Sequence, residues 1–561
     1  MKKIILVVSL LVVAAVYGSY LLMRSPAVSA PFSSYLPTDT LLTVRMINLN
    51  HLTDTFPQTA LGHLLAKETM TQVLGGLGAG QKILDEYARL YDQVGEVMGN
   101  PAFRQIFGDD AVAALLTPAP DVALEEHFVV FATTSVSAPV EAFARLVMSD
   151  TVSREEVDGR SLTRITLEDG SRLYGFAENG LVLLVRNPAL INHLLERRAG
   201  GEGLDTLPAF IEARRYWAQE RGGTGFTELY LGMPALLAWL QGDSRVTEGV
   251  HLNLKGMEGV NYLAATIYQD GEDLNMAGRV GYTYEKLSRA SRAAVDTATS
   301  NTGLNLISSE TLLYSWGTSL IPEVFDETVK SLGNDAYNQL DQRVRLELDM
   351  GLEQLLAAFG QQFGFAMNGM APGGFFPLPK LQAYVQVRDA KVSSAVVDRL
   401  LEELKKQGPG AGDQLAAGDT TIHYWPLLPG EAAQPALALT ADKLLIANGP
   451  SALAEYLQHG GAPDALAKPV ATALGSDLAG MITGANTWVA LCFPRRLSEA
   501  AGSLVDWLLG LAASSQEIDA EQAMTELLRL MRSVEAVVAV NSLYHDYAES
   551  EIVFRSVSAT P

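Results

Sequence analysis

Most of this 561-residue chain reads as the same series of segments twice. Five landmarks occur in the first half and return in the same order roughly 250 to 275 residues later. The five pairs are Leu36–Leu49 with Ile307–Leu320, Phe107 with Phe359, Phe128–Val147 with Ala383–Leu401, Leu181–Gly201 with Lys443–Gly461, and Glu228–Leu240 with Trp488–Ala500. Solenoid repeats have periods of about 20 to 50 residues, so this period is that of a whole domain. We therefore predict two tandem homologous domains, residues 34–285 and 305–557, joined by a polar linker over 286–304.

Within each copy, strand-like and helix-like patterns alternate along the chain. His127–Ser135 has the period of two that is typical of a strand, and a helical pattern follows over residues 138–150. Residues 160–187 read as a meander of strands separated by tight turns. Prominent hairpins favour antiparallel pairing. The sequence therefore predicts an α+β fold in which mainly antiparallel sheets are packed by helices.

Two apolar stripes have the spacing of three and four residues that is typical of an amphipathic helix. The stripes are Leu84, Tyr87, Tyr91, Val94 and Met98 in the first copy, and Val344, Leu348, Leu352, Leu355 and Phe359 in the second. We expect each stripe to lie on one helix that packs against a sheet.

The N-terminus predicts a transmembrane signal-anchor within residues 1–30. The segment from Ile4 to Met23 carries no charge and is long enough to cross the hydrocarbon of a bilayer, which takes about 20 residues. Lys2 and Lys3 precede this segment, so the positive-inside rule keeps the N-terminus in the cytoplasm and sends the body outward. The alternative is a cleaved export signal that ends at Ala30.

The composition argues against nucleic acid as a partner. Asp and Glu outnumber Lys and Arg by 64 to 41, which gives a formal net charge of −23, and nucleic-acid binding depends on the opposite sign. The 8 histidines show no metal-ligand spacing, and the sequence contains no nucleophile elbow or phosphate-loop motif. We therefore predict no cofactor, no metal and no catalytic residues. A hydrolase whose site no motif reveals is kept as an alternative.

One segment suggests a binding surface. Residues 359–379 combine aromatic side chains, methionines and glycines, and flexible Met-rich apolar surfaces are used for adaptable binding. The alternative is that the segment folds into the core. The residues that we predict to form a possible apolar binding surface are Phe363, Phe365, Met367, Met370, Phe375 and Phe376.

The start "YLPTDTLLTVRM" (Tyr35–Met46), the N-terminal membrane segment and the duplicated pattern together resemble an uncharacterised family of bacterial exported proteins. Members of that family carry a domain of unknown function. The resemblance implies a location in the bacterial envelope, and it brings no catalytic residues to this chain.

We therefore expect a protein anchored once in the bacterial inner membrane, with its body in the periplasm. It would act without catalysis, as an interaction or scaffold protein that contacts other envelope proteins. The alternative is a carrier or sensor of a lipid-like apolar ligand held between sheet and helices. A mostly apolar cavity of ligand size would favour the carrier. Converging polar groups with shifted pKa values would favour the hydrolase.

Overall fold

The structure is a computed structural model. It describes residues 31–76, 78–118, 122–133, 152–167, 170–178, 181–220, 224–242, 257–270, 273–297, 300–318, 334–371, 378–407, 412–427, 430–459, 466, 468–500 and 520–557. The predicted anchor, Ile4 to Met23 within residues 1–30, lies outside these ranges. Over the described ranges, no helix combines the length and the apolar composition that crossing a bilayer requires.

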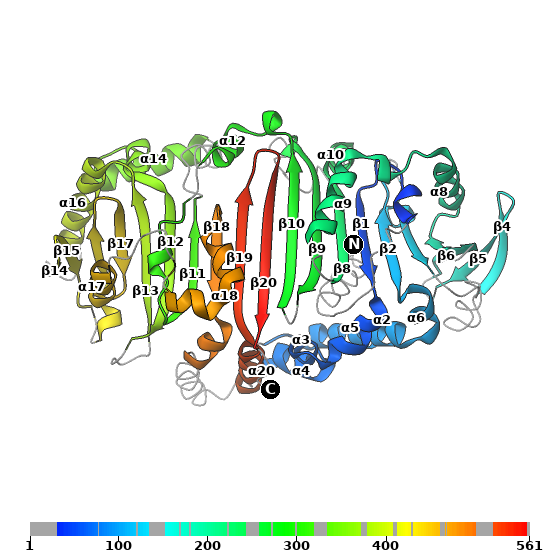
Figure 1. The fold of residues 1–561 in the computed structure, drawn as a ribbon, viewed down its shortest axis with the longest axis horizontal. Helices are drawn as coiled ribbons and strands as arrows, with labels where there is room; N and C mark the ends of the chain where they lie inside the picture. Colours follow the sequence, from blue (N-terminus) through cyan, green and yellow to red (C-terminus); the bar gives the residue numbers. More distant parts are fainter. Residues whose placement is uncertain are drawn as a thin grey trace. The chain divides into compact units, whose positions relative to one another are not determined.

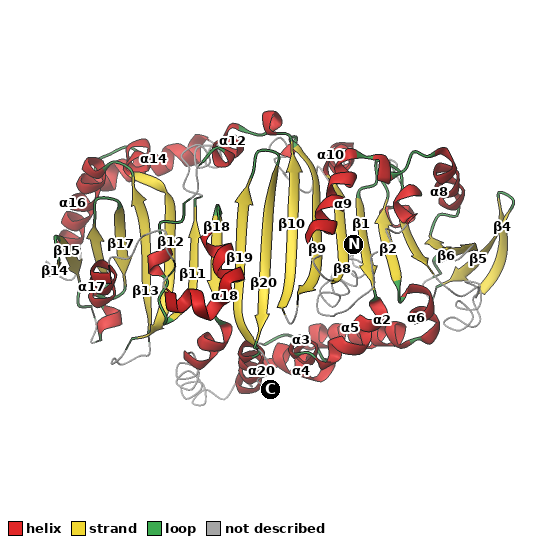
Figure 2. Ribbon diagram, in the orientation of Figure 1, coloured by secondary structure: helices red, strands yellow, loops and turns green. Residues whose placement is uncertain are grey.

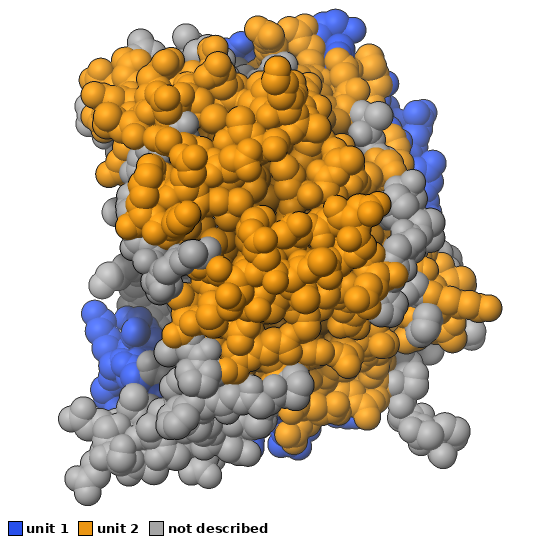
Figure 3. Space-filling view, turned by 90° about the vertical axis from the view of Figure 1, so that its left-hand side faces the viewer, with its two compact units in different colours: residues 1–287, 518–530, 546–549 blue, residues 288–517, 531–545, 550–561 orange. Residues whose placement is uncertain are grey.

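The protein is α+β, with extensive antiparallel sheet and many helices, as the alternating periodicities predict (Figure 2). The chain divides into two compact units, coloured separately in Figure 3. The first unit holds the described residues up to Leu287, together with two C-terminal segments within 518–530 and 546–549. The second unit holds the described residues of 288–517, 531–545 and 550–561.

The strands of the first unit all pair antiparallel. They are β1 (Leu42–Ile47), β2 (Asp110–Leu115), β3 (Phe128–Thr133), β4 (Val152–Val157), β5 (Arg160–Thr166), β6 (Arg172–Glu178), β7 (Leu181–Val185), β8 (Thr224–Gly232), β9 (Val260–Asp270) and β10 (Asp273–Tyr282). Their order is β10-β9-β8-β1-β2-β3-β7-β6-β5-β4.

The strands of the second unit follow the same order. They are β11 (Thr311–Gly317), β12 (Phe359–Met370), β13 (Pro379–Val387), β14 (Asp413–Ala417), β15 (Thr420–Tyr424), β16 (Ala436–Leu439), β17 (Lys443–Ala447), β18 (Trp488–Cys492), β19 (Val534–Leu543) and β20 (Tyr547–Ser556), of which residues 550–556 belong to this unit. Their order is β20-β19-β18-β11-β12-β13-β17-β16-β15-β14. Each strand of this unit therefore pairs as the strand ten places earlier does in the first.

Helices connect the strands in both units (Figure 1). Those up to residue 287 are α2 (Leu49–Thr55), α3 (Ala60–Leu64), α4 (Lys67–Gly76), α5 (Gln81–Gly99), α6 (Pro101–Phe107), α8 (Ala189–Gly200), α9 (Pro208–Glu220) and α10 (Met233–Gly242). Later ones are α12 (Arg289–Val295), α14 (Asn334–Leu348), α15 (Leu352–Ala358), α16 (Ala390–Gln407), α17 (Pro450–His459), α18 (Lys468–Thr483) and α20 (Ala520–Arg532). Short 3₁₀ helices are Pro31–Ser34, Phe56–Gln58, Leu124–His127, Leu204–Thr206, Tyr284–Lys286, Leu304–Leu306 and Glu431–Ala433.

The main core of the first unit lies between one sheet face and helices α8 and α9. Alternate strand residues such as Phe131 and Leu183 point to this face and are fully buried. Ile191 and Leu194 of α8 and Tyr216 of α9 complete the same cluster. Burying each large apolar side chain contributes about 1.5–3 kcal/mol, so this face holds the unit together.

The second unit has its core on the corresponding face. Tyr314 and Trp316 of β11 and Leu491 of β18 are buried under helices α17 and α18. Leu453 of α17 and Leu478 of α18 belong to the same cluster. The apolar face that the period of two creates on the strands therefore packs against the apolar sides of α17 and α18.

The two predicted helical stripes differ from expectation. The first stripe lies on α5, but α5 packs mainly against α4 and α6 rather than against a sheet, and Tyr87 donates a hydrogen bond to the carbonyl of Leu65 at 2.5 Å. The second stripe does not form one helix. Asp349 has a φ of 53°, which ends α14 and separates it from α15, and Phe359 is already the first residue of β12. A single residue in the left-handed region is enough to end a helix, and the apolar spacing cannot reveal it.

Candidate functional site

The structure places the predicted apolar surface residues in and beside β12. Phe363, Phe365 and Met367 are half-buried on one face of the strand, and they alternate with buried residues such as Gln362 and Gly364 on the other. Met370 is the last residue of the strand. Phe375 and Phe376 lie outside the described residues.

The three β12 side chains share their face with neighbouring strands. Phe365 lies opposite Ala383 of β13, which lies opposite Ile446 of β17, and Phe363 lies opposite Gly317 of β11, which lies opposite Trp488 of β18. Ile446 and Trp488 are exposed. The face is thus apolar and partly open to solvent, and a role for it in binding stays a prediction.

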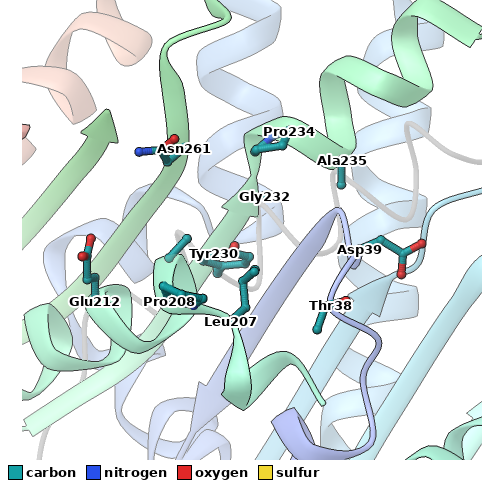
Figure 4. Close-up of a pocket in the computed structure, with 11 residues that line it drawn as sticks. Thr38, Asp39, Leu207, Pro208, Glu212, Tyr230, Gly232, Pro234, Ala235 and Asn261 are labelled. Atoms are coloured by element: carbon teal, nitrogen blue, oxygen red, sulfur yellow. The ribbon is translucent and has the colours of Figure 1, made fainter. Parts of the chain in front are cut away.

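A pocket in the first unit is a second candidate site, which the sequence does not predict. It has a volume of about 490 Å³. Its lining comes from the segment before β1, from the first turns of α9 and α10, from the end of β8 and from the start of β9 (Figure 4). The lining residues are Thr38, Asp39, Leu207, Pro208, Ala209, Glu212, Tyr230, Gly232, Pro234, Ala235 and Asn261.

Local sequence explains how these elements meet. Pro208 and Pro234 occupy the first turns of α9 and α10, where a proline costs no intrahelical hydrogen bond. At Gly232 a Cβ atom would lie 2.9 Å from the carbonyl oxygen of Thr40, so glycine lets β8 approach the start of β1 closely. The backbone N–H of Gly232 donates to the carbonyl of Leu41 at 2.8 Å. These contacts fix the end of β8 against the residues that lead into β1, and both segments contribute to the lining.

Tyr230 is the central polar group of the pocket. Its side chain is only 1% exposed, and its ring meets Phe210 edge-on at 5.1 Å and stacks on Tyr262 at 6.4 Å. Burial, and then the neighbouring Tyr262, raise the pKa of Tyr230. Its hydroxyl finds no hydrogen-bond partner in the described part of the chain, and it lies beside Gly232 of the lining. The phenol therefore keeps its proton at neutral pH and is a polar group beside the lining without a partner among the described residues.

Two carboxylates stand on opposite sides of Tyr230, Asp39 on one and Glu212 on the other (Figure 4). Both side chains are exposed, and neither carboxylate forms an ion pair or side-chain hydrogen bond with the residues that the structure describes. Asn261, by contrast, donates from Nδ2 to Oγ1 of Thr283 at 3.2 Å. The pocket thus combines an apolar wall with two unpaired acids.

The repeat offers a comparison for one of these acids. Asp39 of "LPTDT" corresponds to Glu310 of "ISSET" in the second copy. Nζ of Lys380 donates a hydrogen bond to Oε2 of Glu310 at 2.9 Å, and the two side chains form an ion pair. The acid at this position is therefore neutralised in the second unit, whereas in the first it has no ion-pair partner among the described residues.

A separate polar cluster lies on the core side of the first sheet. Arg45 donates from Nε and Nη2 to the two carboxylate oxygens of Asp110, each at 2.9 Å, and from Nη1 to Glu228 at 3.1 Å. The repeat aligns Arg45 with the buried Trp316, whose Nε1 donates to Gln362 at 3.3 Å. The cluster has fixed internal partners. Across the described ranges, no group of three or more His, Cys, Asp or Glu side chains could hold a metal ion.

The comparisons with known proteins give little further information. No family model and no curated protein matches the chain. Among solved structures, crystal form III of TP0453 is similar over 45% of this chain and 80% of that one, with 9% identity and a TM-score of 0.25. Crystal form I of TP0453 is similar over 46% and 81%, with 9% identity and a TM-score of 0.23. TM-scores this low do not establish a shared fold.

Proposed function

We propose that this protein is a non-enzymatic, membrane-tethered binding protein of the bacterial envelope. Its first unit would hold a small ligand with an apolar body in the pocket beside Tyr230. The observation that carries the proposal is the buried Tyr230 hydroxyl, which lies beside Gly232 of the pocket lining and has no partner among the described residues. A buried polar group without a partner costs about 1–3 kcal/mol, and a ligand that hydrogen-bonds it would remove that cost.

The chemistry of Tyr230 supports binding rather than hydrolysis. Burial raises the pKa of its phenol, so the group keeps its proton at neutral pH. A general base needs a pKa near the working pH, which this group does not have. A neutral hydroxyl in an apolar pocket instead serves to orient a ligand.

The membrane tether and the duplication belong to the same proposal. Ile4 to Met23 would cross the inner membrane once, with the body in the periplasm, and cleavage after Ala30 is the alternative. Two tandem homologous domains are supported by the five repeated landmarks and by the identical strand order in the two units. Divergence after a duplication would explain why the acid at Asp39 is unpaired and the one at Glu310 is not.

Saturation-transfer NMR with 1,8-octanediol tests the pocket in the full-length protein, held in phosphatidylcholine nanodiscs with empty nanodiscs as the blank. Ala235 lines the pocket, so Ala235→Trp should fill it and abolish the signal. Ala238 is exposed on the same helix outside the lining, so Ala238→Trp should keep the signal. Equal signals from the wild type and from Ala235→Trp would refute the proposal.

A second candidate function is protein contact through the β12 face, because the exposed Ile446 and Trp488 extend the face that carries Phe365. Crosslinking in native membranes, followed by mass spectrometry, tests it. Phe365→Ser should remove a partner that the wild type crosslinks while leaving the melting temperature nearly unchanged. A large loss of melting temperature would mark Phe365 as a core residue instead.

A further inference from the structure

The lining of the Tyr230 pocket also indicates the charge of its ligand, an argument that rests on the proposed function. The charged side chains of the lining are Asp39 and Glu212, and none of the described lysines, arginines or histidines belongs to it. Neither carboxylate has a partner within the described residues. A ligand with positive charge would find a counter-ion on each side of Tyr230 (Figure 4).

The N-termini of the two helices beside the pocket contribute positive charge, which opposes the two carboxylates. The size of this contribution decides the sign of the pocket's net charge. α9 and α10 both begin at the lining, and a helix N-terminus carries about +0.5 of an elementary charge. Two such ends sum to about +1, whereas Asp39 and Glu212 together carry two full negative charges. The net field of the pocket is therefore negative. The formal charge of −23 on the whole chain adds to it and attracts cations.

The apolar part of the lining indicates that the ligand also has an apolar part. Leu207, Pro208, Pro234 and Ala235 present hydrocarbon surface between the two acids. The Tyr230 hydroxyl can accept a hydrogen bond from an ammonium group as well as donate one. An aliphatic chain that carries ammonium groups would satisfy the walls, the hydroxyl and both carboxylates at once.

We infer that the pocket binds an aliphatic organic cation, with ammonium groups that pair with Asp39 and Glu212 and an apolar chain that lies over Tyr230. The second unit provides the contrast, because Lys380 already neutralises Glu310 there.

The test compares three probes of equal chain length on the full-length protein in phosphatidylcholine nanodiscs: 1,8-diaminooctane, 1,8-octanediol and octanedioate. Isothermal titration should show the diamine binding roughly tenfold more tightly than the diol, because each of the two exposed ion pairs contributes only modestly to affinity. Octanedioate should bind most weakly. Added NaCl should weaken binding of the diamine and leave binding of the diol unchanged.

Variants separate the two acids from general charge effects. Asp39→Asn and Glu212→Gln should each lower the affinity for the diamine about two- to fivefold without changing the affinity for the diol. Glu196→Gln removes an exposed carboxylate of α8 outside the lining, so it should change neither the affinity for the diamine nor that for the diol.

The outcomes distinguish this inference from the proposed function. If the diol binds as tightly as the diamine, or if Asp39→Asn and Glu212→Gln leave the diamine unchanged, the inference is wrong while the binding function stands. If no probe binds the wild type, the binding function itself is wrong.

Discussion

Arg279 donates a hydrogen bond from Nε to Oε1 of Glu549, 270 residues further along the chain, at 2.9 Å, and its Nη2 donates to the same oxygen. The guanidinium also lies over the rings of Tyr216 and Tyr547, at 4.4 and 4.3 Å from their centroids. The hydroxyl of Tyr282 donates to the carbonyl of Tyr547 at 3.0 Å. One cation thus ties the C-terminal segment 546–549 to the rest of the first unit.

Removing this cation should loosen the C-terminal segment. Arg279→Met should lower the free energy of unfolding by about 2–3 kcal/mol, because it breaks a partly buried ion pair and two cation–π contacts. Hydrogen exchange by mass spectrometry should show the largest loss of protection at residues 546–549. The matched control is Arg172→Met, since Arg172 is exposed on β6. Unchanged exchange in the segment would show that other contacts hold it.

The Arg45 cluster should be more sensitive, because its carboxylates are less exposed. Arg45→Met leaves Asp110 and Glu228, whose side chains are 17% and 7% exposed, without the cation that they share. Urea denaturation should show a loss of about 3–5 kcal/mol. Adding Asp110→Asn to Arg45→Met should recover part of the loss. A double variant no more stable than Arg45→Met would argue against an electrostatic cause.

The stability of the α4–α5 region should fall at high pH. Burial, and then Tyr91, raise the pKa of Tyr87 from 10.0 to about 12. Above pH 10 the unfolded chain loses this proton first, so the free energy of unfolding should decrease between pH 10 and about 12 and be unaffected below pH 10.

Comparing Tyr87→Phe with the wild type isolates this effect. The variant should cost about 1 kcal/mol at neutral pH, through the lost hydrogen bond to Leu65, and should show a flatter alkaline profile. Tyr91→Phe keeps the bond to Leu65 and removes only the smaller cause of the raised pKa of Tyr87, so its alkaline profile should flatten less than that of Tyr87→Phe. Parallel alkaline profiles for Tyr87→Phe and the wild type would contradict the prediction.

Two glycines should respond to alanine in opposite directions. At Gly364 on β12, a Cβ atom would lie 2.4 Å from the ring of Tyr384, so Gly364→Ala should destabilise the second unit by about 1–3 kcal/mol. At Gly95 in α5, an added Cβ atom would have no described atom within 4 Å beyond the backbone of its own helix, so Gly95→Ala should stabilise the helix by up to about 1 kcal/mol. Thermal denaturation of both variants provides the measurement. Equal shifts in the same direction would contradict the packing argument.

Gly364 also shows why the conformation of residues 359–370 was difficult to predict. The glycines and aromatic residues of 359–370 suggest a flexible segment, yet the structure has a regular strand in which Gly364 makes room for Tyr384 on the neighbouring β13. The glycine's role depends on a residue twenty positions away in the chain, and no local pattern reports it.

Local sequence patterns could not predict the candidate pocket either. Asp39, Glu212 and Tyr230 come from three different elements, and each is an ordinary residue in its own segment. The one available signal was "LPTDT", which marks the start of the first copy and contributes Thr38 and Asp39 to the lining. The sequence does not show which side chains surround that acid.

The sequence by itself determined the α+β class and the antiparallel character of the sheets, since periods of two and of three to four residues are local properties of the chain. The repeated landmarks predicted that the same series of segments occurs twice along the chain, and the structure shows the same strand order in its two units. Tertiary structure alone decided which acids stay unpaired, which glycine accommodates a ring, and where Tyr230 meets a pocket. Those outcomes depend on contacts between residues far apart in sequence, and such contacts exist only once the strands have paired.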